Sequence, residues 1–235
     1  MRGHFPDRQG ENSLAVVFDT AQPRAQDAPL PLLGAASSDR LFAWRDGRAV
    51  RVREFLVEAG TLAARLPRAP SAINLCEDRY AFLVAFAALA LRGQTNLLPP
   101  SRAPHAIDEV LAAHPGSYTI GDARLDPAPP HYLRFDPFDL AGGDAADPAV
   151  VDVGLDVAIG YTSGSTGVPK AVEVTHGSLS ALVAWHQEAF AVRAGTRTSH
   201  LAGLGFDAAA WEVWPRLAAG GTLRDAFGRT LLGSG

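Results

Sequence analysis

The chain has 235 residues, 47% of them hydrophobic and 20% charged, and its formal net charge is −4. This composition is that of an ordinary globular protein and excludes a broad basic surface for nucleic acid. The single cysteine, Cys76, excludes an internal disulfide and a multi-thiolate metal site, and its apolar neighbours favour a buried structural thiol. Because no apolar run is long enough to span a bilayer and the N-terminus lacks a signal peptide's apolar core, we expect a cytoplasmic protein without a membrane partner.

The chain divides into an expected leader and an expected domain. Residues 1–38 are rich in Pro, Gln, Asp and Ala and are predicted to be loosely ordered, whereas residues 39–235 are predicted to form a partial domain. Two strand-like runs around Asp46-Gly47 predict a hairpin, because this dipeptide suits the positive φ of a tight turn. Helices and strands then alternate: the predicted helices are 53–66, 78–93 and 103–116, and the predicted strands are 71–76, 94–100 and 117–122.

Alternation of this kind predicts an α/β fold in which parallel-sheet layers are flanked by helices. Residues 122–150 are rich in Pro and Asp and are expected to be a long connection or a surface excursion. Further strands are predicted at 155–161, just after Lys170, at 196–202 and from Thr222. A helix after His176 is expected to place five residues on one apolar face: Leu179, Leu182, Val183, His186 and Phe190. A last helix, FDAAAWEVWPRLAAGG, is expected to be interrupted or to end near Pro215.

The stretch YTSGSTGVPK, residues 161–170, contains the only lysine among 21 Lys and Arg residues. Its glycines, Gly164 and Gly167, permit backbone angles that turn peptide N–H groups inward around an anion. Lys170 adds a compact charge on a flexible stem, which suits a phosphate tail better than the rigid fork of arginine. We therefore predict a phosphate-binding loop whose donors are Thr162, Ser163, Gly164, Ser165, Thr166, Gly167 and Lys170.

Two other interpretations of this stretch compete with a phosphate loop of this kind. Gly, Ser, Thr and Pro are common in loops, so YTSGSTGVPK could be a polar turn without a ligand. The phosphate loop of P-loop NTPases requires Gly before the lysine and Ser or Thr after it. Here Pro169 and Ala171 flank Lys170, so that pattern fails at two positions that the chemistry needs.

The longer run YTSGSTGVPKAVEVTH closely resembles the phosphate-binding signature of the adenylate-forming enzymes. This superfamily includes acyl-CoA synthetases, luciferases and the adenylation domains of nonribosomal peptide synthetases, and Ala171 stands where the family usually has Gly. The resemblance implies the N-terminal part of the family's large domain, with the C-terminal domain absent. It also implies ATP-dependent activation of a carboxylic acid, in particular an amino acid, as an acyl-adenylate with release of pyrophosphate. Lys170 would be a catalytic residue.

The same resemblance implies ligands and partners. ATP and Mg²⁺ would be the cofactors, although no magnesium ligand is found in this chain. The acid would pass to a thiol acceptor, such as the phosphopantetheine of a carrier protein or coenzyme A. A second run, LAGLGFDAAAWEVWPRLAAGGTL, looks like the segment that lines the acyl pocket in amino-acid-activating domains. By this likeness Phe206 and Asp207 would bind substrate, Asp207 would hold its α-ammonium group, and His200 could face the pocket; alternatively, Asp207 caps a helix.

Later motifs of complete family members, including a second lysine, cannot be placed in this sequence. We therefore expect a truncated adenylation domain whose activity is weak or absent. The alternative function is a non-catalytic remnant that binds nucleotide or pyrophosphate. A third possibility is a leftover segment that folds poorly, because apolar helices would lack their packing partners.

Overall fold

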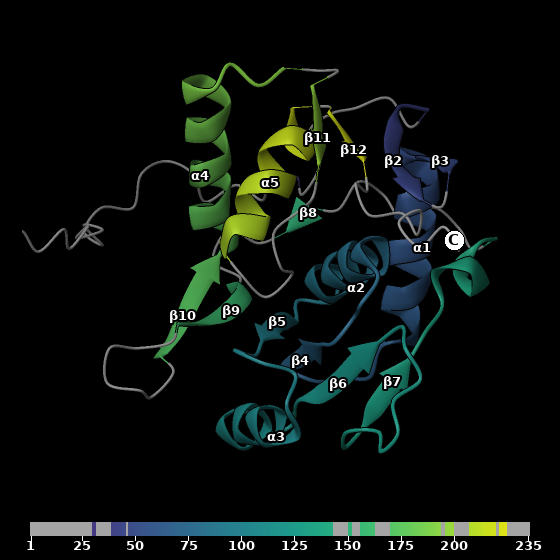
Figure 1. Cartoon of the computed structure of the whole chain (residues 1–235), viewed down its shortest axis with the longest axis vertical. Helices are drawn as coiled ribbons and strands as arrows, with labels where there is room; N and C mark the ends of the chain where they lie inside the picture. Colours follow the sequence, from purple (N-terminus) through teal and green to yellow (C-terminus); the bar gives the residue numbers. More distant parts are fainter. Residues whose placement is uncertain are drawn as a thin grey trace, which may run out of the picture.

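Figure 1 shows a computed structural model of the chain, in which two sheets are stacked with helices between and around them. The structure describes residues 30–31, 39–45, 47–142, 150–151, 156–162, 170–193, 196–199, 207–219 and 221–224.

The larger sheet has six strands in the order β10-β9-β5-β4-β6-β7. All neighbouring strands in it run parallel except the edge strand β10, which is antiparallel to β9. The strands are β4 (Ser71–Asn74), β5 (Thr95–Leu98), β6 (Tyr118–Gly121), β7 (Tyr132–Arg134), β9 (Asp156–Thr162) and β10 (Lys170–Thr175). The predicted parallel-rich α/β fold is therefore confirmed.

A second sheet has four strands in the order β11-β12-β2-β3 and joins distant parts of the chain. Strands β2 (Leu41–Arg45) and β3 (Arg48–Arg51) form the predicted hairpin, and Gly47 in its turn has φ +76°. Strand β12 (Thr222–Arg224) pairs in parallel with β2, and β11 (Arg197–Ser199) pairs in parallel with β12. A separate pair joins β1 (Leu30–Pro31) to β8 (Val150–Val151), so two residues of the expected leader lie in a strand, while the remainder of 1–38 is outside the described residues.

Five α-helices and one short 3₁₀ helix lie in the described part of the chain. They are α1 (Val52–Arg65), α2 (Arg79–Leu91), α3 (Pro104–Ala113), α4 (His176–Ala189), α5 (Asp207–Ala218) and η1 (Pro137–Leu140). Every residue of α2 from Tyr80 to Ala90 is buried, which fits a helix that is apolar all round. Asp78 caps this helix by accepting a 2.7 Å hydrogen bond from the amide of Ala81.

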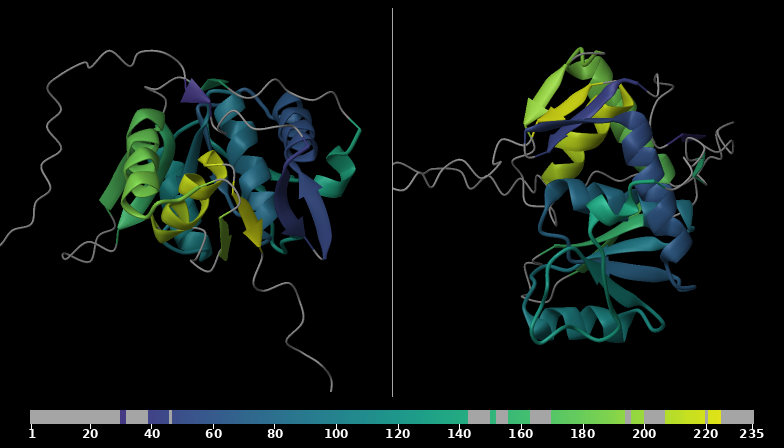
Figure 2. Two further views of the ribbon diagram at one scale, coloured as in Figure 1. Left: turned by 90° about the horizontal axis from the view of Figure 1, so that it is seen from above. Right: turned by 90° about the vertical axis from the view of Figure 1, so that its right-hand side faces the viewer.

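The two sheets share one large apolar core, with α2 between them. Figure 1 shows α2 on the side of the six-stranded sheet that faces the second sheet, and α3 on the opposite side. The right-hand view in Figure 2 has the same order, with α3 at the bottom and the second sheet at the top. A smaller core under α3 consists of Ile73, Leu75, Leu97, Ile107, Val110 and Ile159. Helices on both faces explain why all four residues of β4 and all four residues of β6 are buried.

Two expectations for the middle and the end of the chain were wrong in part. Residues 122–150 include β7, which pairs with β6, and the helix η1, so this segment is not wholly a connection. Helix α5 continues through Pro215 to Ala218. Proline costs the helix one backbone hydrogen bond, and the burial of Val213, Trp214 and Leu217 around it offsets that cost.

The predicted apolar face of α4 was also only partly right. Leu179 and His186 are buried and Leu182 and Val183 are half-buried, but Phe190, which follows the last residue of the helix, is 61% exposed. Among the described helices, none is long and apolar enough to cross a membrane.

Candidate phosphate-binding site

The predicted phosphate loop connects the two strands of a hairpin at the edge of the six-stranded sheet. Thr162 ends β9, Lys170 begins β10, and these two residues face each other as partners in the antiparallel register. The connection between them, with the predicted donors Ser163, Gly164, Ser165, Thr166 and Gly167, lies outside the described residues. The structure thus brings the first and last predicted donors together at the base of the connection.

Lys170 is available to an anionic ligand. Its side chain is exposed, and the described residues give it no carboxylate partner within ion-pair distance. A lysine on an edge strand also protects the sheet from pairing with another chain, so its position alone fits both roles. Its place directly beside a Gly- and Ser-rich connection favours the binding of a phosphate over a role in protecting the edge strand alone.

Tyr161, the first residue of the motif, is held in place by contacts with the small core under α3 and with His114. Its ring is half-buried against the small core under α3, and its hydroxyl lies 3.0 Å from Nε2 of His114. Burial raises the pKa of the Tyr161 hydroxyl, which therefore stays protonated at neutral pH. Sequence reasoning missed His114, because an isolated histidine near the end of a helix carries no signal of a partner 47 residues away.

The predicted acyl-pocket residues follow the carboxyl end of β11. Strand β11, helix α5 and the parallel strand β12 form a βαβ unit, and Asp207 is the first residue of α5. Ligands of open α/β sheets bind near the carboxyl ends of strands, so the position of Asp207 fits a ligand role. Its side chain, together with His200 and Phe206, lies outside the described residues.

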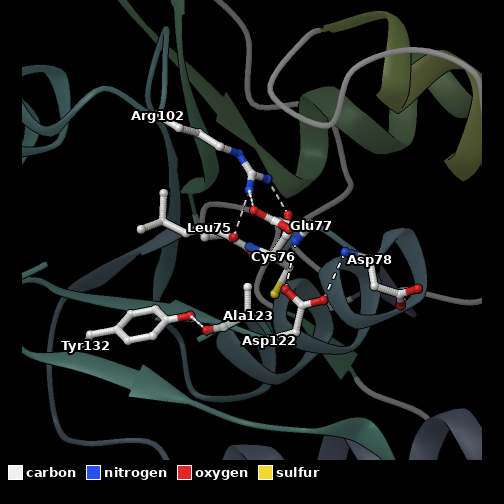
Figure 3. A network of polar contacts seen from close by, with 9 residues as sticks. Leu75, Cys76, Glu77, Asp78, Arg102, Asp122, Ala123 and Tyr132 are labelled. Carbon is white, nitrogen blue, oxygen red and sulfur yellow. Dashed lines mark hydrogen bonds and ion pairs between the residues drawn. The ribbon is translucent and has the colours of Figure 1, made fainter. Parts of the chain in front are cut away.

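A second region where a ligand could bind is the crevice between β4 and β6. The chain leaves β4 toward β5 on one side and leaves β6 toward β7 on the other, which is where doubly wound sheets commonly bind nucleotides. Here the polar groups of the protein contact one another (Figure 3). The carboxylate of Asp122 accepts hydrogen bonds from the amides of Glu77 (2.8 Å) and Asp78 (2.9 Å), at the start of α2.

Arg102 reaches the same network from the connection between β5 and α3. Its guanidinium donates to the carbonyl oxygens of Leu75 (3.1 Å) and Cys76 and lies 3.6 Å from the carboxylate of Glu77. Cys76 is fully buried, and burial, with Asp122 nearby, raises the pKa of its thiol well above the usual range. Burial of the thiol agrees with the predicted structural cysteine, and the guanidinium of Arg102 is engaged by groups of the protein itself.

The described residues do not supply a metal site. No group of three or more His, Cys, Asp or Glu side chains in this part of the chain is placed to hold an ion. His186 is buried beside α5, and its burial, with Arg216 nearby, lowers its pKa, so it packs as a neutral core histidine. The exposed ammonium of Lys170 fits the phosphates of ATP, whereas the described residues do not identify ligands for Mg²⁺.

Comparisons with known proteins agree with the motif and with the fold. Residues 122–225 match the AMP-binding enzyme family. The linear gramicidin synthase of Brevibacillus parabrevis has a component that is 50% identical over 86 residues, which cover 36% of this chain and 2% of that protein. Malpinin synthetase of Mortierella alpina is 29% identical over 218 residues, which cover 88% of this chain and 3% of that protein. The chain thus spans a small fraction of the length of these relatives.

The fold has a solved counterpart. The N-terminal subdomain of Klebsiella oxytoca NpsA, in complex with 3-hydroxybenzoyl-AMSN, superposes with a TM-score of 0.66 at 23% identity. The match covers 80% of this chain and 50% of that chain. The resemblance found in the sequence is thereby confirmed over residues 122–225, which match the AMP-binding enzyme family, and the chain shares the fold of this N-terminal subdomain.

Proposed function

We propose that this chain contributes the phosphate-binding half of a site that activates a carboxylic acid with ATP. The observation that carries the proposal is the register pair Thr162–Lys170, which places the one lysine of the chain at the base of the Gly- and Ser-rich connection. An exposed ammonium at that point can neutralise phosphate charge, and charge-assisted hydrogen bonds of this kind are the strong ones.

The reaction needs little covalent chemistry from the protein. A carboxylate oxygen of the acid attacks the α-phosphorus of ATP, the bond to the bridging oxygen breaks, and pyrophosphate leaves with the electron pair. Lys170 would hold the departing phosphates and stabilise the charge that develops on them. Mg²⁺, which the family uses, would add further positive charge when bound.

The proposed substrate is an amino acid. Asp207 at the start of α5 would pair with its α-ammonium group, and Phe206 and His200 would line the pocket beside it. The position of Asp207 after the carboxyl end of β11 supports this assignment. The acyl group would then pass to a thiol, whose sulfur attacks the acyl carbon and displaces AMP; a carrier protein's phosphopantetheine or coenzyme A would supply that thiol.

Substrate-dependent exchange of labelled pyrophosphate into ATP tests this function directly. The purified chain would be assayed with pools of amino acids, aryl acids and fatty acids, beside the Lys170→Ala variant. The proposal predicts exchange with the amino-acid pool that Lys170→Ala abolishes. Binding of ATP without exchange in any pool, by folded protein, would contradict activation by this chain and would leave a nucleotide-binding role.

A further inference from the structure

The hairpin that carries the phosphate loop extends beyond the sheet that supports it. Pairing of β9 with β5 ends at Gly160, opposite Leu98. Pairing of β9 with β10 continues through Tyr161–Ala171 to Thr162–Lys170. The last two residue pairs therefore form a two-stranded tip, and a two-stranded ribbon by itself is marginally stable in water.

Packing against the outer strand contributes little to this tip. The side chains of Lys170, Ala171 and Val172 in β10 are all exposed. On β9, by contrast, the ring of Tyr161 packs against the small core under α3. Among the tip side chains that the structure describes, that of Tyr161 is therefore the one packed against the body of the protein.

His114 is the polar contact of that ring. Its Nε2 lies 3.0 Å from the Tyr161 hydroxyl, and either atom can donate, depending on the tautomer of the imidazole. The backbone of His114 is itself fixed, because its amide donates a 3.0 Å hydrogen bond to the carbonyl of Val110 at the end of α3. A helix end is therefore connected to the first residue of the phosphate-binding motif.

We propose that His114 is a positioning residue for Lys170, because its hydrogen bond to Tyr161 fixes the two-stranded tip in which Lys170 pairs with Thr162. This hydrogen bond, called the tether below, holds Lys170 in place before the ligand arrives, so its loss lowers the fraction of molecules that are competent to bind. The effect on ligand affinity rests on the proposed function, but the effect on the strands does not.

Two variants remove the tether and two serve as comparisons. Tyr161→Phe deletes only the hydroxyl, and His114→Ala deletes its partner. His114→Gln keeps a side chain that can hydrogen-bond to the tyrosine. Tyr118→Phe is the matched control, since Tyr118 lies in β6, away from the hairpin, and its buried hydroxyl donates a 2.9 Å hydrogen bond to Gln94.

Two measurements on the full chain separate the parts of the proposal. Amide hydrogen exchange of the strands 156–162 and 170–175, without nucleotide, reports on the tip, and equilibrium dialysis with MgATP gives the Kd. We expect Tyr161→Phe and His114→Ala to speed exchange in both strands and to raise the Kd about fivefold, the factor that corresponds to one ordinary hydrogen bond. His114→Gln should recover part of both effects, and Tyr118→Phe should cause neither.

Each result decides one part. If amide hydrogen exchange in the two strands is the same in the wild type, Tyr161→Phe and His114→Ala, the hydrogen bond does not stabilise the tip. Faster exchange with an unchanged Kd would overturn the positioning role while leaving the tether in place. A wild-type chain that does not bind MgATP would contradict the proposed function and, with it, the effect on ligand affinity; the tether would then be decided by the exchange data alone.

Discussion

The hydroxyl of Tyr80 in α2 donates a 2.7 Å hydrogen bond to Oε2 of Glu58 in α1, and both residues are more than 90% buried. The guanidinium of Arg45, from β2, lies 5.3 Å from the centre of the Tyr80 ring. The contact between the first two helices and the second sheet thus contains a buried carboxylate with a specific donor. A buried acceptor that loses its donor is costly, because no water replaces it.

Tyr80→Phe should therefore lower the free energy of unfolding by about 1–3 kcal/mol, measured by urea denaturation. Tyr132→Phe is the control, because it also removes one tyrosine hydroxyl, which donates to the Ala123 carbonyl at a half-buried position. The control should lose less of its free energy of unfolding than Tyr80→Phe does. Equal losses of unfolding free energy in the two variants would show that leaving the Glu58 carboxylate without its donor has no special cost.

Glu58 should also make stability depend on pH. Burial raises the pKa of its carboxyl, and the Tyr80 hydrogen bond and Arg45 only partly oppose this. The folded chain consequently binds this proton more tightly than the unfolded chain does. The contribution is fully present below the unfolded pKa of a glutamate and is lost as pH rises through the higher folded pKa.

Urea denaturation of the wild type and of Glu58→Gln at several pH values would test this sign. Relative to Glu58→Gln, the wild type should be more stable near pH 4 than near pH 7, because the amide does not titrate. A difference between the two proteins that grows in favour of the wild type as pH rises would contradict the raised pKa.

Asp122→Asn tests whether the crevice between β4 and β6 is structural. The amide side chain keeps one acceptor oxygen for the two amides of Glu77 and Asp78 and loses the charge. We expect a loss of about 1–3 kcal/mol in the free energy of unfolding, with no change in the Kd for MgATP. A large rise in that Kd with unchanged stability would place part of the nucleotide site in this crevice.

Leu217→Ala tests whether the second sheet and α5 fold together with the rest of the chain. Leu217 is fully buried in the large core that also contains α2, so its truncation should cost about 2–5 kcal/mol within a single cooperative transition. Phe190→Ala, at an exposed position, should cost much less. Two separate transitions would mean that the α5 layer folds independently, and no cooperative transition would favour a segment that folds poorly.

Much of the fold could be predicted because its signals are local. The alternation of α2, β5, α3 and β6 follows from apolar periodicity and from end signals such as the Asp78 cap and Gly93, whose φ is +65°. Strand β7 was missed because it is a three-residue edge strand that follows two prolines and depends on β6 for its pairing. The second sheet is also non-local: the Thr222 hydroxyl donates to the carbonyl of Leu41, 181 residues away.

In the candidate site, too, the features with local sequence signals could be predicted and the long-range contacts could not. The motif around Lys170 could be recognised from its residue types alone, because a lysine beside Gly, Ser and Thr has a clear chemical meaning. The contact of His114 with Tyr161 could not, since it depends on where the end of α3 lies under β9. Nor could the contacts of Asp122 and Arg102 with residues 75–78, because they join segments that are 26 to 45 residues apart in the sequence.

The most direct test of the account is the equilibrium Kd for MgATP of the wild type, Lys170→Ala and Lys170→Arg. Because Lys170 is exposed, neither substitution should change the melting temperature. We predict that Lys170→Ala raises the Kd at least about tenfold, the loss of one charge-assisted hydrogen bond, and that Lys170→Arg recovers only part of it. The same Kd for the wild type and Lys170→Ala, with both proteins folded, would contradict the claim that this hairpin binds the phosphates.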